Sequence, residues 1–161
     1  MRKTIKRAML ATVLLIMAAA AGHAQISTKV EKAINEIASR YDDVDNVECV
    51  TVTKGSGLEM IKVMLNKQFG KDFMKGVRSI TIINYSEATE TTCQAVRNDL
   101  NVFLTLLEEF KVGEEEEFAD NDYIRCFASS SEGNTISDFV VAIENGDSKM
   151  LMYMAGEIKV E

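Results

Sequence analysis

The C-terminal quarter of the chain constrains its fold more than any other segment. Residues 135–144, "TISDFVVAIE", and residues 149–161, "KMLMYMAGEIKVE", are both rich in apolar residues that suit β-strands. Between them lies the dipeptide Asn145-Gly146, which tolerates the positive φ angles of a tight hairpin turn. The sequence therefore predicts a long β-hairpin at the end of the chain.

The last strand of this hairpin is apolar on both faces, which predicts a central or helix-covered strand. Three methionines alternate along it with three other apolar residues, namely Met150, Met152 and Met154 with Leu151, Tyr153 and Ala155. Thioethers also bind Cu(I), so a copper site is the alternative to a core strand. Methionine fills irregular core space well, and no histidine lies nearby in sequence, so a core strand is favoured.

The preceding residues indicate an alternation of helices and strands. Helices are expected at 27–43, at 57–70 and from Cys93 to Phe110, and strands at 47–53, 77–84 and 123–129. Gly70 is the expected C-terminal cap of the second helix. The predicted fold is α+β, with a mixed sheet of about five strands that ends in an antiparallel three-strand meander. Helices pack on this sheet, and residues 25–161 form a single domain.

The helix expected over residues 93–110 carries the strongest local pattern. Its apolar residues recur at alternating steps of three and four, at Cys93, Val96, Leu100, Phe103, Leu107 and Phe110. Such a stripe indicates a helix laid across its own sheet. A seam for a partner helix is the alternative, although the stripe is short for a coiled coil.

The first 24 residues are typical of a secretory signal peptide. Four basic residues precede the apolar stretch "MLATVLLIMAAAA", and the small residues Gly22 and Ala24 precede Gln25. A transmembrane anchor is the alternative, but the apolar stretch is shorter than the ~20 residues that cross a bilayer. We therefore expect cleavage after residue 24 and export to the periplasm or the extracellular space, with no transmembrane anchor left. No cysteine stands at the cleavage point, so a bacterial lipid anchor is not expected there.

The charge of the exported chain bears on its partners. The leader holds four of the 18 basic residues and none of the 25 acidic ones, which leaves residues 25–161 with a formal charge of −11. Nucleic acids and anionic membrane surfaces repel a chain of this charge, so neither is an expected partner.

Histidine and cysteine usage limits the possible chemistry. The only histidine is His23, in the leader, so catalysis by Ser-His-Asp or Cys-His and histidine-based zinc sites are excluded for the exported chain. Three cysteines remain, Cys49, Cys93 and Cys126, each within an apolar pattern. They are expected to be small core residues, and a disulfide between two of them is the alternative.

Two further patterns invite a binding site. Acidic residues cluster at Asp42, Asp43 and Asp45, and again at Glu114–Glu117, Asp120 and Asp122. Calcium binds clustered oxygen ligands, but neither cluster has EF-hand spacing, so solvated charged loops are expected. In "TKGSGLEM", Gly55 and Gly57 precede a helix and could hold an anion, yet Lys54 stands before the glycines, unlike a Walker motif. An ordinary strand-to-helix turn is expected. No catalytic or cofactor-binding residue is predicted, and the metal question stays open.

The segments "DFVVAIENGDSKMLMYMAGEIKVE" and "VECVTVTKGSGLEM" carry a resemblance. They are similar to a family of small exported domains of unknown function that is common in Bacteroidota. The resemblance implies an opening helix and a short strand that leads into a helix. Many members look like lipoproteins, whereas this chain lacks the lipid-accepting cysteine. The family brings no assigned catalytic residues.

Taken together, these patterns predict a non-enzymatic exported envelope protein. It would bind a protein or a small ligand through a sheet edge or a helix surface. The alternatives are a calcium or copper binder, and a hydrolase that uses two carboxylates in a cleft.

Overall fold

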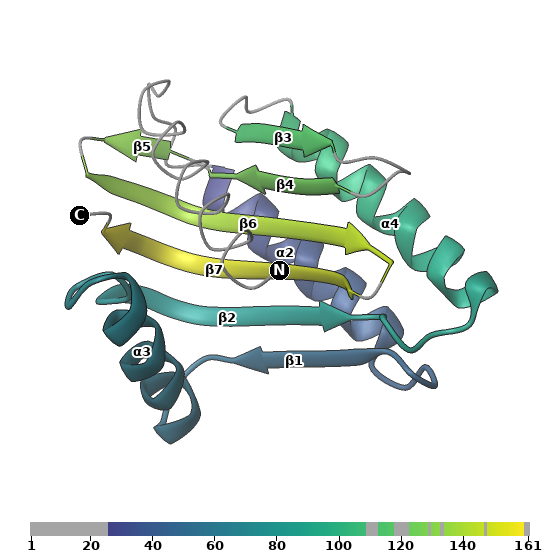
Figure 1. The fold of residues 1–161 in the computed structure, drawn as a ribbon, viewed down its shortest axis with the longest axis horizontal. Helices are drawn as coiled ribbons and strands as arrows, with labels where there is room; N and C mark the ends of the chain where they lie inside the picture. The colour runs from purple at the N-terminus through teal and green to yellow at the C-terminus, as the bar shows by residue number, and fades with distance from the viewer. Residues whose placement is uncertain are drawn as a thin grey trace.

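The structure, a computed structural model, describes residues 26–108, 113–117, 123–128, 130–132, 134–146 and 148–159. Within them the chain forms three helices and seven strands (Figure 1). The helices are α2 (Ile26–Tyr41), α3 (Ser56–Phe69) and α4 (Glu90–Glu108). The strands are β1 (Glu48–Val52), β2 (Gly76–Asn84), β3 (Gly113–Glu117), β4 (Tyr123–Phe127), β5 (Ser130–Glu132), β6 (Thr135–Asn145) and β7 (Ser148–Lys159). The expected α+β class is confirmed. None of the helices described has the length and apolar character that crossing a bilayer requires.

The seven described strands form one sheet. Its order is β1-β2-β7-β6-β4-β3, and β5 also pairs with β6. The C-terminal meander of β4, β6 and β7 is confirmed. Every pairing between described strands is antiparallel, so the sheet differs from the expected mixed sheet of about five strands. It has no parallel pair among the described residues, and it has two more strands.

The path of α3 explains the antiparallel pairing of β1 and β2. A strand–helix–strand segment gives parallel strands when its helix carries the chain back along the sheet. Here α3 lies across one end of the sheet, so β2 begins near the end at which β1 finishes (Figure 1). The two strands then run in opposite directions, from Glu48 opposite Asn84 to Val52 opposite Ile80.

One of the additional strands corrects the expectation of an acidic loop. Residues Glu114–Glu117 lie in β3, at the edge of the sheet, and pair with β4. Backbone hydrogen bonds hold such a strand and do not depend on its side chains, which is why the acidic composition did not prevent it. Charged residues on an edge strand also discourage pairing with another chain. Asp120 and Asp122 lie outside the described residues.

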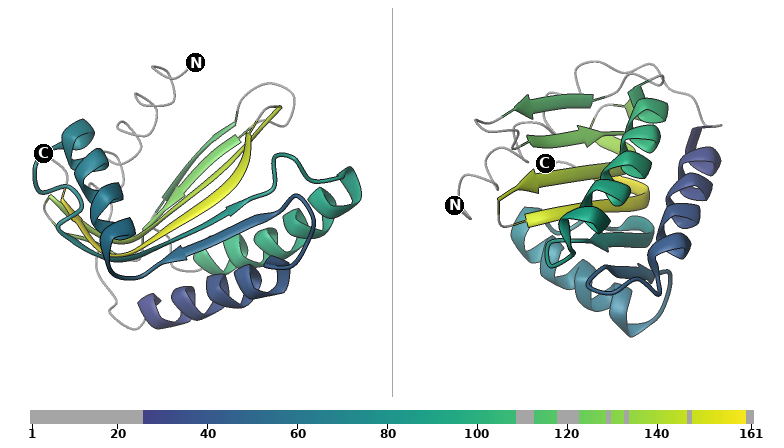
Figure 2. Two further views of the ribbon diagram at one scale, coloured as in Figure 1. Left: turned by 90° about the horizontal axis from the view of Figure 1, so that it is seen from below. Right: turned by 90° about the vertical axis from the view of Figure 1, so that its right-hand side faces the viewer.

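Helices cover the two faces of the sheet unequally. α2 and α4 lie side by side on one face, and α3 covers only one end of the other (Figures 1 and 2). The first core lies between the sheet and the α2/α4 pair and includes Ile34 and Tyr153. The second core lies on the opposite face of the sheet, where α3 contributes Leu58 and β6 contributes Phe139.

The apolar stripe of α4 faces the sheet, as expected. Its members Cys93, Val96, Leu100 and Phe103 are all buried in the first core. The side chain of Leu107 and the whole of Phe110 lie outside the part of the chain that the structure describes. The four described side chains of the stripe therefore pack within their own domain.

Strand β7 lies between β2 and β6 in the middle of the sheet, which confirms a central strand. Leu151, Tyr153 and Ala155 belong to the first core. Met154 is 2% exposed in the second core, and Met150 and Met152 are partly buried against it. Methionine thus fills core space on this face, completely at one position and partly at two.

The predicted hairpin joins β6 to β7, but Asn145 is the last residue of β6, and neither Asn145 nor Gly146 has the expected positive φ. Asn145 pairs with Ser148, and the Oδ1 atom of Asn145 accepts a hydrogen bond from the Ser148 N–H at 3.0 Å. The side chain of Asn145 therefore holds the turn.

Two β-bulges, one in each pairing of β7, bend the sheet (Figure 2). One lies in β2, where Arg78 is the extra residue between Val77 and Ser79, and the other lies in β7, where Ala155 and Gly156 face the single residue Asp138 of β6. Asp138, opposite the second bulge, has a φ of 53°, and its Oδ1 atom accepts a hydrogen bond from the Gly156 N–H at 3.0 Å. Bulges of this kind increase local twist and re-aim the strand.

Candidate functional site

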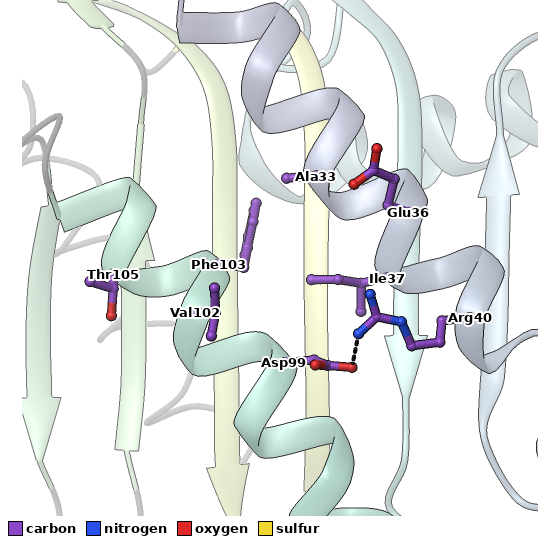
Figure 3. A pocket seen from close by; sticks show the side chains of 8 residues that line it. All are labelled: Ala33, Glu36, Ile37, Arg40, Asp99, Val102, Phe103 and Thr105. Atoms are coloured by element: carbon purple, nitrogen blue, oxygen red, sulfur yellow. Dashed lines mark hydrogen bonds and ion pairs between the residues drawn. The ribbon is translucent and has the colours of Figure 1, made fainter.

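A cavity of about 540 Å³ lies between α2 and α4 (Figure 3). We name it the α2/α4 groove. α2 contributes Ala33, Glu36, Ile37 and Arg40, and α4 contributes Asp99, Val102, Phe103 and Thr105. Its lining is largely apolar, which is typical of sites that bind small ligands or side chains.

Buried and exposed apolar residues meet in this groove. Ile37 and Phe103 belong to the first core, where they are almost fully buried. Val102, next to Phe103 in the chain, is 73% exposed. An apolar surface therefore continues from the core of the protein to solvent at this point.

An ion pair crosses the groove between the two helices. The Arg40 Nη1 atom donates a hydrogen bond to Asp99 Oδ2 at 2.5 Å, and the Tyr41 hydroxyl donates to the same oxygen at 2.8 Å. The hydrogen bond to Asp99 raises the pKa of the Arg40 guanidinium. Burial, and then the hydrogen bond to Asp99, raise the pKa of Tyr41 to about 12. Arg40 is thus a fixed cation beside an apolar surface.

The groups that line the groove are suited to binding a ligand. Asp99 Oδ2 already accepts two hydrogen bonds, whereas the side chain of Arg40 is 59% exposed and has further N–H donors. A ligand with an apolar group and a neighbouring hydrogen-bond acceptor fits this arrangement. Figure 3 shows Val102 and Phe103 on the α4 side, with Arg40 reaching across from α2.

A second polar cluster joins α4 to the sheet. Arg97 donates from Nε to Glu144 Oε1 and from Nη1 to Glu90 Oε1, the latter at 2.8 Å. Tyr85 donates from its hydroxyl to the other oxygen of Glu144 at 3.3 Å. The hydrogen bond with Arg97 lowers the pKa of Glu90. These hydrogen bonds satisfy the buried carboxylate of Glu144, so the cluster is best explained as a structural contact that holds α4 against β6.

The three cysteines are present as thiols, and two of them are buried as expected. Cys93 lies in the first core and Cys126 in the second, on opposite faces of the sheet. Cys49 is only partly buried, and that burial raises the pKa of its thiol, with Asp42 adding to the effect. The sheet separates Cys126 from the other two, so it cannot pair with either without rearrangement.

No described residues form a metal-binding cluster of three or more histidine, cysteine or acidic side chains. The turn after α2 holds Asp42, Asp43 and Asp45, whose side chains are exposed. The side chains of Glu114–Glu117 lie outside the part of the chain that the structure describes, so the calcium alternative stays a prediction there.

The glycines of "TKGSGLEM" make a strand-to-helix turn. Gly55 has a φ of 91° and immediately precedes α3, and Gly57 lies in the first turn of the helix. At the other end, Gly70 caps α3, and its N–H donates to the Asn66 carbonyl at 3.0 Å. Gly55 and Gly70 therefore each have a local structural role, at the two ends of α3.

Sequence reasoning did not identify the groove. Arg40 and Asp99 stand 59 residues apart, and neither belongs to a recognisable motif. The available signal was Val102, an apolar residue outside the stripe of α4. No family model, curated protein or solved structure matches this chain.

Proposed function

We propose that this chain is a non-enzymatic exported envelope protein that binds a partner segment or a small ligand in the α2/α4 groove. The observation that carries the proposal is the apolar surface that runs from Phe103 in the core to the exposed Val102. Isolated exposed apolar residues are common on proteins. Here the exposed valine borders a cavity with a charged hydrogen-bond donor, Arg40, on its other side.

The proposed ligand presents an apolar group with an acceptor beside it. The apolar group would cover Val102 and the floor formed by Ile37 and Phe103. The acceptor, such as a carboxylate or a carbonyl oxygen, would bond to the free N–H groups of Arg40. Glu36, at the rim, would disfavour a second negative charge.

Two features of the sequence support the non-enzymatic part of the proposal. The exported chain has no histidine, and its sequence contains no recognisable catalytic motif. The resemblance to exported domains of unknown function agrees with an envelope location. The calcium, copper and hydrolase alternatives have no supporting observation among the described residues.

Affinity capture from the native envelope tests the groove with matched variants. Val102→Asp places a charge at the groove, whereas Val50→Asp changes a valine that is 48% exposed on β1, away from it. We expect a molecule that co-purifies with the native protein and with Val50→Asp but not with Val102→Asp. Arg40→Ala should weaken its retention. Equal retention by Val102→Asp and the native protein would exclude the groove as the binding site.

A further inference from the structure

The outer face of α3 carries exposed apolar residues. Met60, Val63 and Met64 are 72%, 67% and 60% exposed. They are three of the five large hydrophobic residues that are exposed in the described part of the chain. The inner face of α3 is also apolar, since Leu58 is buried and Ile61 and Leu65 pack against the second core. α3 is thus apolar on the side that it does not need for folding.

Basic residues gather around the same helix. Residues 54–78 contain six basic and two acidic side chains, a net charge of +4. The remainder of residues 25–161 contains eight basic and 23 acidic side chains, a net charge of −15. The basic residues are Lys54, Lys62, Lys67, Lys71, Lys75 and Arg78. Five of them lie in α3 or within a few residues of its ends, whereas the charge of Arg78 acts on Tyr153, in the first core on the other face of the sheet. The overall charge of −11 therefore conceals a basic region around α3.

Ion pairs within this region use few of its cations. Glu59 pairs with Lys62 at 3.5 Å, and Asp72 pairs with Lys75 at 3.8 Å. These are the only two acidic residues between 54 and 78, so four cations remain in excess. Lys67 is exposed and follows Met60 and Met64 at helical spacing, so it shares their outer face.

The acidic parts of the molecule lie far from α3 on the scale of electrostatic screening. The acidic edge strand β3 is five strand spacings from β1, which amounts to about 24 Å. The acidic turn at 42–45 precedes β1, whereas α3 follows it, and a strand of this length spans about 17 Å. Both distances exceed the Debye length of about 8 Å at physiological salt. Neither acidic cluster therefore reaches a surface that approaches α3, and the acidic residue that pairs with residues 54–78 is Glu157, opposite Gly76.

The composition of α3 favours a lipid surface over a protein partner. Protein interfaces are enriched in methionine, as this face is, but they are depleted in lysine. Their hot spots are mostly tryptophan, tyrosine and arginine, none of which occurs in α3. Helices that lie on membranes combine an apolar face with flanking lysines. A fluid bilayer also needs no shape complementarity from three flexible or small side chains.

We propose that α3 attaches the exported protein to the surface of an anionic membrane. Met60, Val63 and Met64 would enter the boundary between headgroups and acyl chains, and the surrounding lysines would contact the phosphates. This attachment is peripheral and differs from a transmembrane anchor. It is independent of the α2/α4 groove, which lies on the other side of the sheet.

Vesicle sedimentation tests the proposal on the exported protein. At physiological salt, we expect it to bind vesicles of phosphatidylglycerol and phosphatidylcholine, and to bind pure phosphatidylcholine vesicles at least tenfold more weakly. The triple variant Met60→Gln, Val63→Gln and Met64→Gln should lose at least tenfold in partitioning onto the mixed vesicles. Val50→Gln, a change of a valine that is 48% exposed on β1 and lies outside α3, should bind as the native protein does.

A charge variant provides a second, independent readout. Lys67→Gln together with Lys71→Gln should weaken binding to the mixed vesicles, and added salt should do the same for the native protein. The charge variant still tests the proposal if the triple variant unfolds at a lower temperature than the native protein. Failure of the native protein to bind the mixed vesicles would overturn the proposal, as would full binding by the triple variant. Loss of an acidic protein partner by the triple variant, without vesicle binding by the native protein, would assign the surface to protein recognition instead.

Discussion

Gly156 of β7 occupies a position that only glycine fits. Its φ is 107°, and a Cβ atom built there would lie 2.4 Å from the Gly76 carbonyl oxygen. The same residue donates its N–H to Asp138 of the neighbouring strand, which faces both Ala155 and Gly156. The bend of the sheet therefore depends on one residue without a side chain, which lies in the bulge of β7 and faces the bulge of β2.

Gly156→Ala should destabilise the protein by at least about 2 kcal/mol, because it combines a strained φ with a backbone clash. Gly146→Ala is the matched control. A Cβ atom there has nothing within 4 Å, and we expect a change of no more than about 0.5 kcal/mol. Urea denaturation of both variants measures the difference. Similar stabilities for the two would mean that β7 can shift at Gly156.

Tyr41 should make stability depend on pH in the alkaline range. Its pKa is raised to about 12 in the folded protein, against about 10 in an unfolded chain. A raised pKa means that the neutral phenol is favoured by folding. Its contribution is fully present below about pH 10 and is lost as the pH rises through about 12.

The measurement is urea denaturation of the native protein and Tyr41→Phe at intervals from about pH 8 to about pH 12. The stability difference between them should be constant up to about pH 10 and shrink above it. Tyr153, whose pKa is also raised, chiefly by burial, is present in both proteins and so cancels. A difference that stays constant up to pH 12 would show that Tyr41 titrates normally.

At the scale of elements, α4 has a buried face and an exposed apolar face within one turn, at Leu100 and Val102. Leu100→Ala should cost about 2 to 5 kcal/mol, as buried leucine truncations do. Val102→Ala, on the same helix, should change stability by no more than about 0.5 kcal/mol, because Val102 is 73% exposed. Thermal and urea denaturation of the two variants measure these changes in stability. A small cost at Leu100 would mean that the stripe serves a partner instead of the core.

Strand β7 gives the test of the copper alternative. Leucine resembles methionine in volume, and such exchanges usually cost less than about 1.5 kcal/mol. The triple variant Met150→Leu, Met152→Leu and Met154→Leu should therefore fold and keep the binding of the native protein. Cu(I) titration under reducing conditions, with thermal melts, compares the two. Tight stoichiometric binding that vanishes in the variant would establish a metal-handling protein.

At the scale of the whole molecule, export remains a prediction that mass spectrometry can check. The basic, apolar and small-residue order of the leader predicts removal of residues 1–24. The intact mass of the protein from cells should place Gln25, or its cyclised form, at the N-terminus. A chain that retains Met1 and stays embedded in the membrane would refute cleavage.

Local patterns predicted the elements better than their arrangement. The stripe through Leu100 and the turn at Asn145 report the immediate surroundings of each residue, so helix α4 and the last hairpin could be predicted. Which strands become neighbours depends on the path of α3, and no periodicity encodes that path. The α2/α4 groove could not be predicted for the same reason, because Arg40 and Asp99 meet only after both helices have packed on the sheet.

The position of β7 has a consequence for the order in which the protein can form. β7 follows every other described strand in the chain, yet it lies between β2 and β6 in the middle of the sheet. Without it, β1 and β2 are not joined to β6 and β4, and both cores lack the residues that β7 contributes. Pairing of distant segments also slows folding. The two halves of the sheet therefore come together only when β7 pairs with both β2 and β6.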